Sequence, residues 1–278
     1  MQVRAPAKIN LNLRVLGRDS ATGYHRLETW MAPLTLADDL RVELTESPGI
    51  QLSCSDADLD SGTGNLAWKA ADLFLQKTKT PGGARIELHK NIPYGAGLGG
   101  GSSDAAAVLK ALNEQTGRPL DTPGLEHLAA QLGSDIPFFI RGTAAMARGR
   151  GELLEPRPLS APFDLLLIKP PFGVETAWSY RQWSEKKFCP EEWTTPQLHS
   201  GIEIFNDLER PVFAKLIILA ALKQWLLEHS LVAAAAMTGS GSCLFAILHD
   251  PRGAGQLATE AKTEFGETFW TTACRTTH

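Results

Sequence analysis

Residues 91–107 of the chain read Asn-Ile-Pro-Tyr-Gly-Ala-Gly-Leu-Gly-Gly-Gly-Ser-Ser-Asp-Ala-Ala-Ala, a glycine-rich loop that opens a helix. Glycine has no Cβ, so the backbone at these five glycines can take positive φ and let an anion approach its amide nitrogens. The N–H groups and the dipole of the following helix favour the same anion. Ser102 and Ser103 could donate to phosphate or bind a magnesium ion. The segment therefore predicts a polyphosphate site.

Two common nucleotide motifs overlap this loop, and neither fits. Gly95-x-Gly97-x-x-Gly100 has the spacing of the dinucleotide fingerprint, but no acidic residue follows a strand–helix–strand unit about twenty positions on. A Walker A loop would need lysine where Gly101 stands. The remaining alternative is a flexible Gly/Ser linker. A proline before the glycines and helical apolar spacing after them place the loop between ordered elements, which favours phosphate binding.

Composition limits the class of protein. The chain has 278 residues, of which 43% are hydrophobic, and this is enough for one large domain or two ordinary ones. A net charge of −4 gives no general attraction to nucleic acid or to an anionic membrane. The four cysteines are widely spaced, without a CxxC pair, which argues against a zinc site or a disulfide framework. With no apolar signal core or long apolar run, the sequence predicts a soluble, cytoplasmic protein without nucleic-acid or membrane partners.

Local patterns predict strand-rich units with segregated helices, which is the α+β class. Strands are expected at residues 3–16, 25–34, 39–45, 49–54, 84–88, 163–168, 231–237, 243–248 and 267–273. Helices are expected from residue 66, after the glycine loop, and at residues 122–132, 211–229 and 252–265. Five prolines between residues 155 and 171 predict a boundary between two domains, 1–156 and 157–278.

A kinase that uses the loop also needs a base for the accepting hydroxyl and a positive charge near the transferred phosphoryl group. Asp135 is the best candidate base, because Pro137 places it at the end of an element. Its alternative role is that of a helix C-cap or a surface aspartate. Lys8 is the best candidate cation, because lysine in an apolar strand is costly to bury unless it is paired. Alternation with Asn10 and Asn12 fits a solvent-facing Lys8 equally well.

Two further loops have an ordinary explanation and a functional one. The segment Thr238-Gly239-Ser240-Gly241-Ser242 lies between two apolar runs and is typical of a tight hairpin. Gly23-Tyr24-His25 is typical of a loop that enters a strand, with both rings packed. A role in ligand binding is the less common outcome for either segment when it is taken alone.

Three segments together nevertheless resemble the ordered motifs of the galactokinase, homoserine kinase, mevalonate kinase and phosphomevalonate kinase (GHMP) superfamily. They are Pro6-Ala7-Lys8-Ile9-Asn10-Leu11-Asn12-Leu13, the glycine loop, and Met237-Thr238-Gly239-Ser240-Gly241-Ser242. The resemblance implies a two-domain α+β fold with the active site in the cleft between the domains, and an enzyme that uses ATP and Mg²⁺. It places the catalytic pair at Lys8 and Asp135 and the adenosine pocket at Asn65 and Lys90. It places the phosphate loop at Pro93, Tyr94, Gly95, Ala96, Gly97, Leu98, Gly99, Gly100, Gly101, Ser102 and Ser103.

Three more segments are similar to one branch of this superfamily, at residues 23–25, 133–139 and 206–209. That branch phosphorylates a small molecule, the cytidine diphosphate derivative of methylerythritol, in isoprenoid biosynthesis. The resemblance implies a cytosine site at Tyr24, His25 and Tyr180, and a further substrate contact at Asn10. Two alternatives remain open. One is another kinase of the superfamily, which has no use for a cytosine pocket. The other is a nucleotide-binding regulator or an RNA-binding protein, since small α+β sheets also bind RNA.

Overall fold

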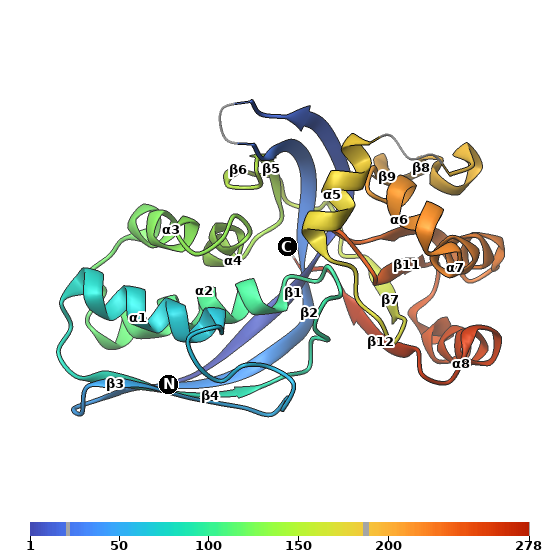
Figure 1. Cartoon of the computed structure of the whole chain (residues 1–278). Helices are drawn as coiled ribbons and strands as arrows, with labels where there is room; N and C mark the ends of the chain where they lie inside the picture. The colour runs from blue at the N-terminus through green and yellow to red at the C-terminus, as the bar shows by residue number, and fades with distance from the viewer. Residues whose placement is uncertain (21–22, 186–188, 278) are drawn as a thin grey trace. The chain divides into compact units, whose positions relative to one another are not determined.

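The computed structural model describes residues 1–20, 23–185 and 189–277, which pack into two compact units (Figure 1). The first unit comprises Met1–Ala7, Leu36–Tyr94 and Gly99–Thr143. The second comprises Lys8–Thr35, Gly95–Leu98 and Ala144–His278. The long strands β1 (Gln2–Arg18) and β2 (His25–Thr45) contribute residues to both units. The units therefore interleave along the sequence, and the expected boundary between residues 156 and 157 stays a prediction.

The first unit contains a sheet that has one buried and one solvated face. The end of β2 pairs antiparallel with β4 (Gly83–His89), and β4 pairs parallel with β3 (Gly49–Cys54). Along β4, Ala84, Ile86 and Leu88 are buried, whereas the residues between them are exposed. This alternation with period two is typical of a sheet that is covered on one side only.

Four helices complete the first unit: α1 (Leu66–Thr78), α2 (Gly100–Gln115), α3 (Thr122–Ala130) and α4 (Ile136–Arg141). Asn65 caps α1 through Ala67, and Asp121 caps α3 through Gly124. Small apolar residues such as Ala105 and Ala106 bury much of α2, which packs against α1 and α4 (Figure 1). The glycine loop thus leads directly into the central helix of this unit.

The second unit contains two groups of strands. In one group β1 pairs parallel with β9 (Ile202–Asn206), which pairs with β8 (Gln197–His199). In the same group β2 pairs with β5 (Ala145–Gly149), and β5 pairs with β6 (Leu153–Pro156). The other group is an antiparallel sheet in the order β10-β11-β7-β12. Its strands are β7 (Asp164–Lys169), β10 (Val232–Met237), β11 (Leu244–Leu248) and β12 (Trp270–Arg275).

Helices pack on these strands to build the core of the second unit. They are α5 (Thr176–Ser184), α6 (Glu209–Lys215), α7 (Ile217–Glu228), α8 (Ala254–Phe265) and the short turns η1 (Glu191–Thr194) and η2 (Pro251–Gly253). The buried core includes Leu166 and Ile168 of β7, Leu226 of α7 and Leu257 of α8. The combination of mixed strands with segregated helices confirms the predicted α+β class.

Three predicted elements differ from the observed ones. The strands expected at residues 25–34 and 39–45 form the single strand β2, because residues 35–38 remain extended and Asp38 finds buried partners. The long helix expected at residues 211–229 is instead α6 and α7. Leu216, at φ −114° and ψ 69°, lies outside the helical region and separates them.

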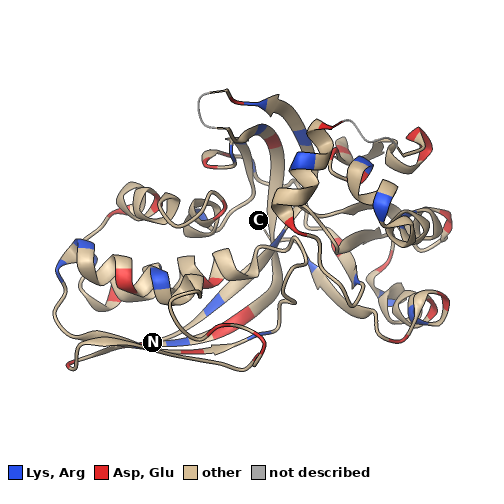
Figure 2. Ribbon diagram, in the orientation of Figure 1, with Lys and Arg blue, Asp and Glu red and all other residues tan. Residues whose placement is uncertain are grey.

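Acidic and basic residues are interspersed along the elements of both units (Figure 2). This distribution agrees with the small net charge of −4. Within the part of the chain that the structure describes, we find no helix with the length and apolar character needed to cross a membrane.

Candidate active site

The glycine loop has the backbone conformation of an anion site. Gly95, Gly97 and Gly99 have φ of 65°, 75° and 73°, so left-handed residues alternate along the loop. Successive N–H groups in such an alternation form a concave anion-binding surface. Gly99 is also the N-cap of α2 and provides no side chain to cap its first turn. The expectation of positive φ at Gly100 and Gly101 is wrong, because these two residues already lie in the right-handed first turn of α2.

The second glycine loop, residues 238–242, contacts the beginning of the first. It connects β10 and β11 as the predicted hairpin turn. In addition, the N–H of Cys243 donates to the carbonyl of Ala96 at 3.2 Å. A Cβ at Gly97 would overlap the carbonyl oxygen of Thr238. The close approach of the two loops therefore requires glycine at position 97.

Lys8 is buried, with 4% of its surface exposed, so the solvent-facing alternative is wrong. Its Nζ donates to Oδ1 of Asn10 at 2.6 Å, and Nδ2 of Asn10 donates to Oγ1 of Thr29 at 2.8 Å. The N–H of Asn10 donates to Oγ1 of Thr238 at 3.1 Å. These bonds fix the orientation of the Asn10 amide and hold the ammonium within a buried polar network.

Asp135 lies at the position expected from the sequence, directly before α4. Pro137 occupies the first turn of this helix, and the buried residues Ile136, Phe138 and Phe139 anchor it. Asp135 is half-buried, and its side chain makes no capping hydrogen bond. Asp135 is thus the N-cap residue of α4 by position, and the expected alternative of a helix C-cap is wrong, because Gln131 is the C-cap of the preceding helix α3. Asp135 belongs to the first unit and Lys8 to the second, and their joint action stays a prediction.

The two residues predicted for the adenosine pocket have structural partners. Asn65 caps α1 through Oδ1, and its Nδ2 donates to the carbonyl of Asp60 at 2.8 Å. Nζ of Lys90 donates to the carboxylates of Asp38 and Asp104. A role of these two residues in adenosine binding stays a prediction.

Asp38 and Asp104 are charged residues that the sequence reasoning missed. Both are buried, although one lies in a strand and the other in a helix of small apolar residues. Burial raises the pKa of Asp104 to about 7, and the neighbouring Asp38 carboxylate adds to this rise. Burial lowers the pKa of Lys90, but the attraction of Asp104 and Asp38 outweighs it and raises that pKa overall. The signal that could have identified them is an acidic residue at a position where the periodicity of the strand or helix predicts an apolar one.

Two of the three residues predicted for the cytosine site lie in direct contact. The rings of His25 and Tyr180 stack with their centroids 5.3 Å apart and an interplanar angle of 28°. Trp183 meets the His25 ring edge-on at 6.0 Å, and Nε2 of His25 lies 2.5 Å from Oγ of Ser184. Burial, together with the positive charge of Arg18, lowers the pKa of His25. Trp183 and Ser184, one helical turn after Tyr180, had no signal in the sequence that singled them out.

Tyr24, the third residue predicted for the cytosine site, is 58% exposed. The guanidinium of Arg150 lies 5.0 Å from the centroid of its ring, at the distance of a cation–π contact. Tyr24 therefore presents an aromatic surface to solvent in the same unit as His25 and Tyr180.

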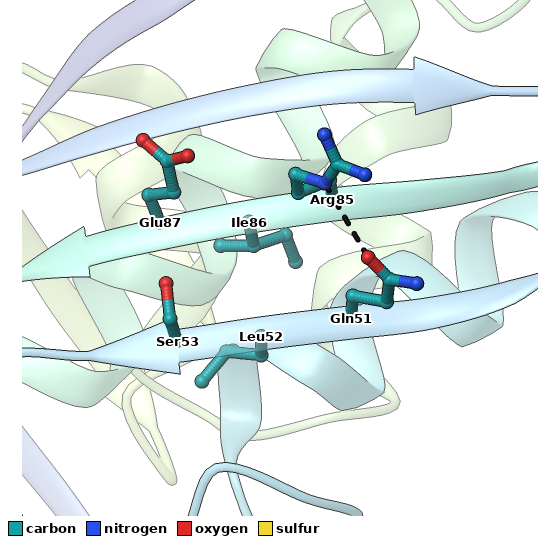
Figure 3. A pocket seen from close by; sticks show the side chains of 6 residues that line it. All are labelled: Gln51, Leu52, Ser53, Arg85, Ile86 and Glu87. Atoms are coloured by element: carbon teal, nitrogen blue, oxygen red, sulfur yellow. Dashed lines mark hydrogen bonds between the residues drawn. The ribbon is translucent and has the colours of Figure 1, made fainter.

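A pocket on the first unit lies apart from all of these residues (Figure 3). Gln51, Leu52, Ser53, Arg85, Ile86 and Glu87 line it on β3 and β4. Its polar side chains lie on the exposed face of the sheet, where Nε of Arg85 donates to Gln51 at 3.4 Å. None of the predicted site residues contributes to this pocket.

Comparison with known proteins assigns the class. The model of the GHMP kinases N terminal domain matches residues 65–143, and the model of the GHMP kinases C terminal domain matches residues 197–267. A crystal structure of homoserine kinase from Cytophaga hutchinsonii, at 16% identity, shares the fold with a TM-score of 0.67. The match covers all of this chain and 94% of the homoserine kinase chain.

More similar proteins share one name. The 4-diphosphocytidyl-2-C-methyl-D-erythritol kinase of Methylacidiphilum infernorum is 43% identical over 96% of this chain and 93% of its own length. The protein of the same name from Geotalea daltonii is 36% identical over 95% of each chain. A crystal structure of 4-(cytidine 5'-diphospho)-2C-methyl-D-erythritol kinase, at 38% identity, matches the whole of both chains with a TM-score of 0.82. The chain belongs to the GHMP kinases and, within them, to the family of the 4-diphosphocytidyl-2-C-methyl-D-erythritol kinases.

Proposed function

We propose that the chain transfers the γ-phosphoryl group of ATP to the 2-hydroxyl of 4-diphosphocytidyl-2-C-methyl-D-erythritol in non-mevalonate isoprenoid biosynthesis. The observation that carries the proposal is similarity along nearly the whole chain to kinases of this name, which rises to 43% identity. The alternating left-handed glycines support ATP as the phosphate donor. The relatives are kinases, so the comparisons give no support to a non-enzymatic regulator.

Magnesium would accompany ATP, because phosphoryl transfer needs charge neutralisation on the β- and γ-oxygens. Oγ of Ser103 is buried without a hydrogen-bond partner among the described residues, and this hydroxyl fits a metal ligand. No group of three metal-binding side chains occurs in residues 1–20, 23–185 and 189–277. Mg²⁺ itself usually keeps several waters and binds substrate phosphates together with one or two protein ligands.

Asp135 and Lys8 would carry the chemistry. Asp135, half-buried and without a capping bond, would accept the proton of the acceptor hydroxyl. Lys8 would stabilise the charge that develops on the transferred phosphoryl group. The bond from Lys8 to Asn10 supports this role, because it leaves a buried ammonium with a fixed direction.

The aromatic residues of the second unit would select the cytidine part of the substrate. Tyr24 and Tyr180 would cover the faces of the cytosine ring, and the backbone of His25 would read its polar edge. The stack of His25 on Tyr180 supports this assignment, because it restricts both rings. The side chain of Asn10 is engaged by Lys8 and Thr29, so a substrate contact would add to these bonds. The absence of nucleic-acid partners and a cytoplasmic location stay predictions from composition.

Turnover of matched alcohols tests the proposal. We expect strong preference for the cytidine diphosphate substrate over its uridine analogue, with little phosphorylation of homoserine, mevalonate or galactose. Uracil presents an acceptor where cytosine has a donor, and sites built on such hydrogen bonds discriminate by roughly four to five orders of magnitude. Equal kcat/KM for the uridine analogue, or preferred turnover of one of the other alcohols, would contradict the substrate but leave the kinase class intact.

A further inference from the structure

Three charged side chains form a buried cluster in the first unit, which we call the Asp38–Lys90–Asp104 cluster. Nζ of Lys90 donates to Oδ2 of Asp38 and, at 2.7 Å, to Oδ2 of Asp104. The exposed fractions of these side chains are 8% for Lys90, 0% for Asp38 and 3% for Asp104. Oδ1 of Asp38 accepts the backbone N–H groups of Asn91 at 2.6 Å and Ile92 at 2.8 Å.

The cluster touches both ends of the phosphate loop. Asn91 and Ile92 come directly before the loop, and Lys90 follows the end of β4. Asp104 lies directly after the loop, at the start of α2. Asp38 thus binds the backbone directly before the loop, Asp104 lies directly after the loop, and Lys90 pairs with both carboxylates.

The cluster and the residue directly before the loop also pack closely against Gly100. A Cβ on Gly100 would lie 3.0 Å from Cγ2 of Ile92 and 3.3 Å from Nζ of Lys90. The first turn of α2 therefore sits directly against the cluster, and any movement of the ammonium moves the atoms that support this turn.

Stability alone does not explain a buried cluster of this kind. With both carboxylates ionised the cluster would carry one negative charge, and apolar residues of similar volume are often at least as stabilising as buried ion pairs. Oδ1 of Asp104 is also buried without a hydrogen-bond partner among the described residues, which adds a desolvation cost. What the ions provide instead is direction, because Oδ1 of Asp38 fixes two backbone N–H groups and Oδ2 of each carboxylate fixes the ammonium of Lys90.

We propose that the Asp38–Lys90–Asp104 cluster positions the phosphate loop for ATP, with Asp38 and Asp104 as positioning residues. The inference rests on the proposed function only in taking ATP as the ligand of the loop. In this proposal Lys90 acts through the loop and α2, and its predicted place in the adenosine pocket is a separate question, which the variants of Asp104 leave untouched.

Asp104→Ala tests the cluster with the least damage, because it leaves the pair of Lys90 with Asp38 intact. Calorimetric titration with ATP should show an affinity about tenfold weaker or more, since small displacements of binding groups have large effects. The KM for the alcohol substrate should stay within about twofold of the parent, because the residues predicted to bind that substrate belong to the second unit and the cluster to the first. Asp104→Asn keeps an acceptor for Lys90 and should restore most of the affinity.

Asn113→Ala is the matched control, because Asn113 is a buried polar residue of the same helix. Its side chain makes two hydrogen bonds to the backbone of Leu120, at 2.9 and 3.0 Å. This variant should lower the melting temperature and keep the affinity for ATP. Lys90→Met should weaken ATP binding at least as much as Asp104→Ala. If Lys90→Met does not fold, the ATP affinities of Asp104→Ala and Asp104→Asn still test the proposal.

Unchanged ATP affinity in folded Asp104→Ala would overturn the proposal, and so would an equal loss in Asn113→Ala. Failure of the proposed function gives a different result, in which the parent binds ATP but does not phosphorylate the cytidine diphosphate substrate. The calorimetric comparison would then still decide the role of the cluster. A parent that does not bind ATP would overturn both.

Discussion

Lys8 is an ammonium group in the apolar strand β1, and its surroundings leave it little freedom. Asn10 accepts its hydrogen bond at 2.6 Å, and the amide of Asn10 cannot turn over without losing the bond to Thr29. The backbone N–H of Lys8 donates to the carbonyl of Leu98 in the phosphate loop at 2.9 Å. A single residue is therefore linked through its backbone to the loop and through its side chain to β2.

Asp135→Asn is expected to lose turnover by roughly a hundredfold or more while ATP binding is kept, because the amide retains the shape and loses the base. Lys8→Ala should also lower kcat strongly. The double variant should lose much less than the two single losses combined, since residues that act as one unit are not additive. Steady-state kinetics and ATP titration of the three variants check this, and additive losses would separate the two residues.

Thr238→Val should destabilise the protein by about 1–3 kcal/mol, because it leaves the buried N–H of Asn10 without an acceptor. Thr238→Ser keeps the hydroxyl and is the control, with a smaller loss. Chemical denaturation of the two variants measures the difference. Equal unfolding free energies for Val and Ser would show that the hydroxyl of Thr238 does not stabilise this network.

Sequence reasoning at this scale identified Lys8 as a candidate but not its environment. Its two explanations, buried and solvent-facing, differ only in which face of β1 is covered. Thr238, which binds Asn10 two residues further along β1, lies 228 positions from Asn10. Asp38 and Asp104 were missed for a similar reason. Asp38 stands beside Asp39 and Asp104 follows two serines, so neither is conspicuous in the sequence, and only the fold brings them to the same lysine.

At the scale of elements, the turn into α2 combines two properties that are usually separate. Gly99 takes the left-handed conformation that an anion site uses, while Gly100 leaves room for Ile92 and Lys90. Neighbouring glycines thus serve different purposes, one for backbone conformation and one for packing.

Gly99→Val is expected to abolish measurable ATP binding while circular dichroism stays native. A β-branched residue at φ 73° is strained, and such strain costs on the order of 1–3 kcal/mol. Gly255→Ala is the control, since Gly255 lies in α8 with ordinary φ, and a Cβ added there would have no neighbour within 4 Å. Unchanged calorimetric ATP affinity in folded Gly99→Val would show that phosphate binds elsewhere.

Elements with strong periodicity were predicted best. The strand at residues 49–54 has the predicted bounds, and the hairpin β10–β11 lies where the apolar runs flank the second glycine loop. The break at Leu216 was missed, because apolar spacing continues through it without glycine or proline. The short strands β5, β6, β8 and β9 were missed as well. Each is only three to five residues long, and β5 and β9 join the sheet through the distant strands β2 and β1.

For the whole molecule, the proposed function includes a magnesium ion that binds together with ATP. Chelation with EDTA should therefore stop turnover while the melting temperature stays unchanged, unlike removal of a structural zinc, which unfolds its domain. Excess MgCl₂ should restore activity. Full activity in the presence of chelator, or a lowered melting temperature, would contradict a catalytic magnesium that is bound with the nucleotide.

The long-range pairing of β1 also determines how long this strand remains without its partners during synthesis. Asn10 and its partner Thr238 are separated by 228 residues, and β1 pairs in parallel with β9 through Asn12 and Phe205. At synthesis rates of about 5–20 residues per second, the first strand waits roughly 10–45 s for its last partners. During that interval one edge of β1 stays unpaired, and an open apolar edge invites association with other chains. The nascent chain is thus most exposed to aggregation until Thr238 has left the ribosome.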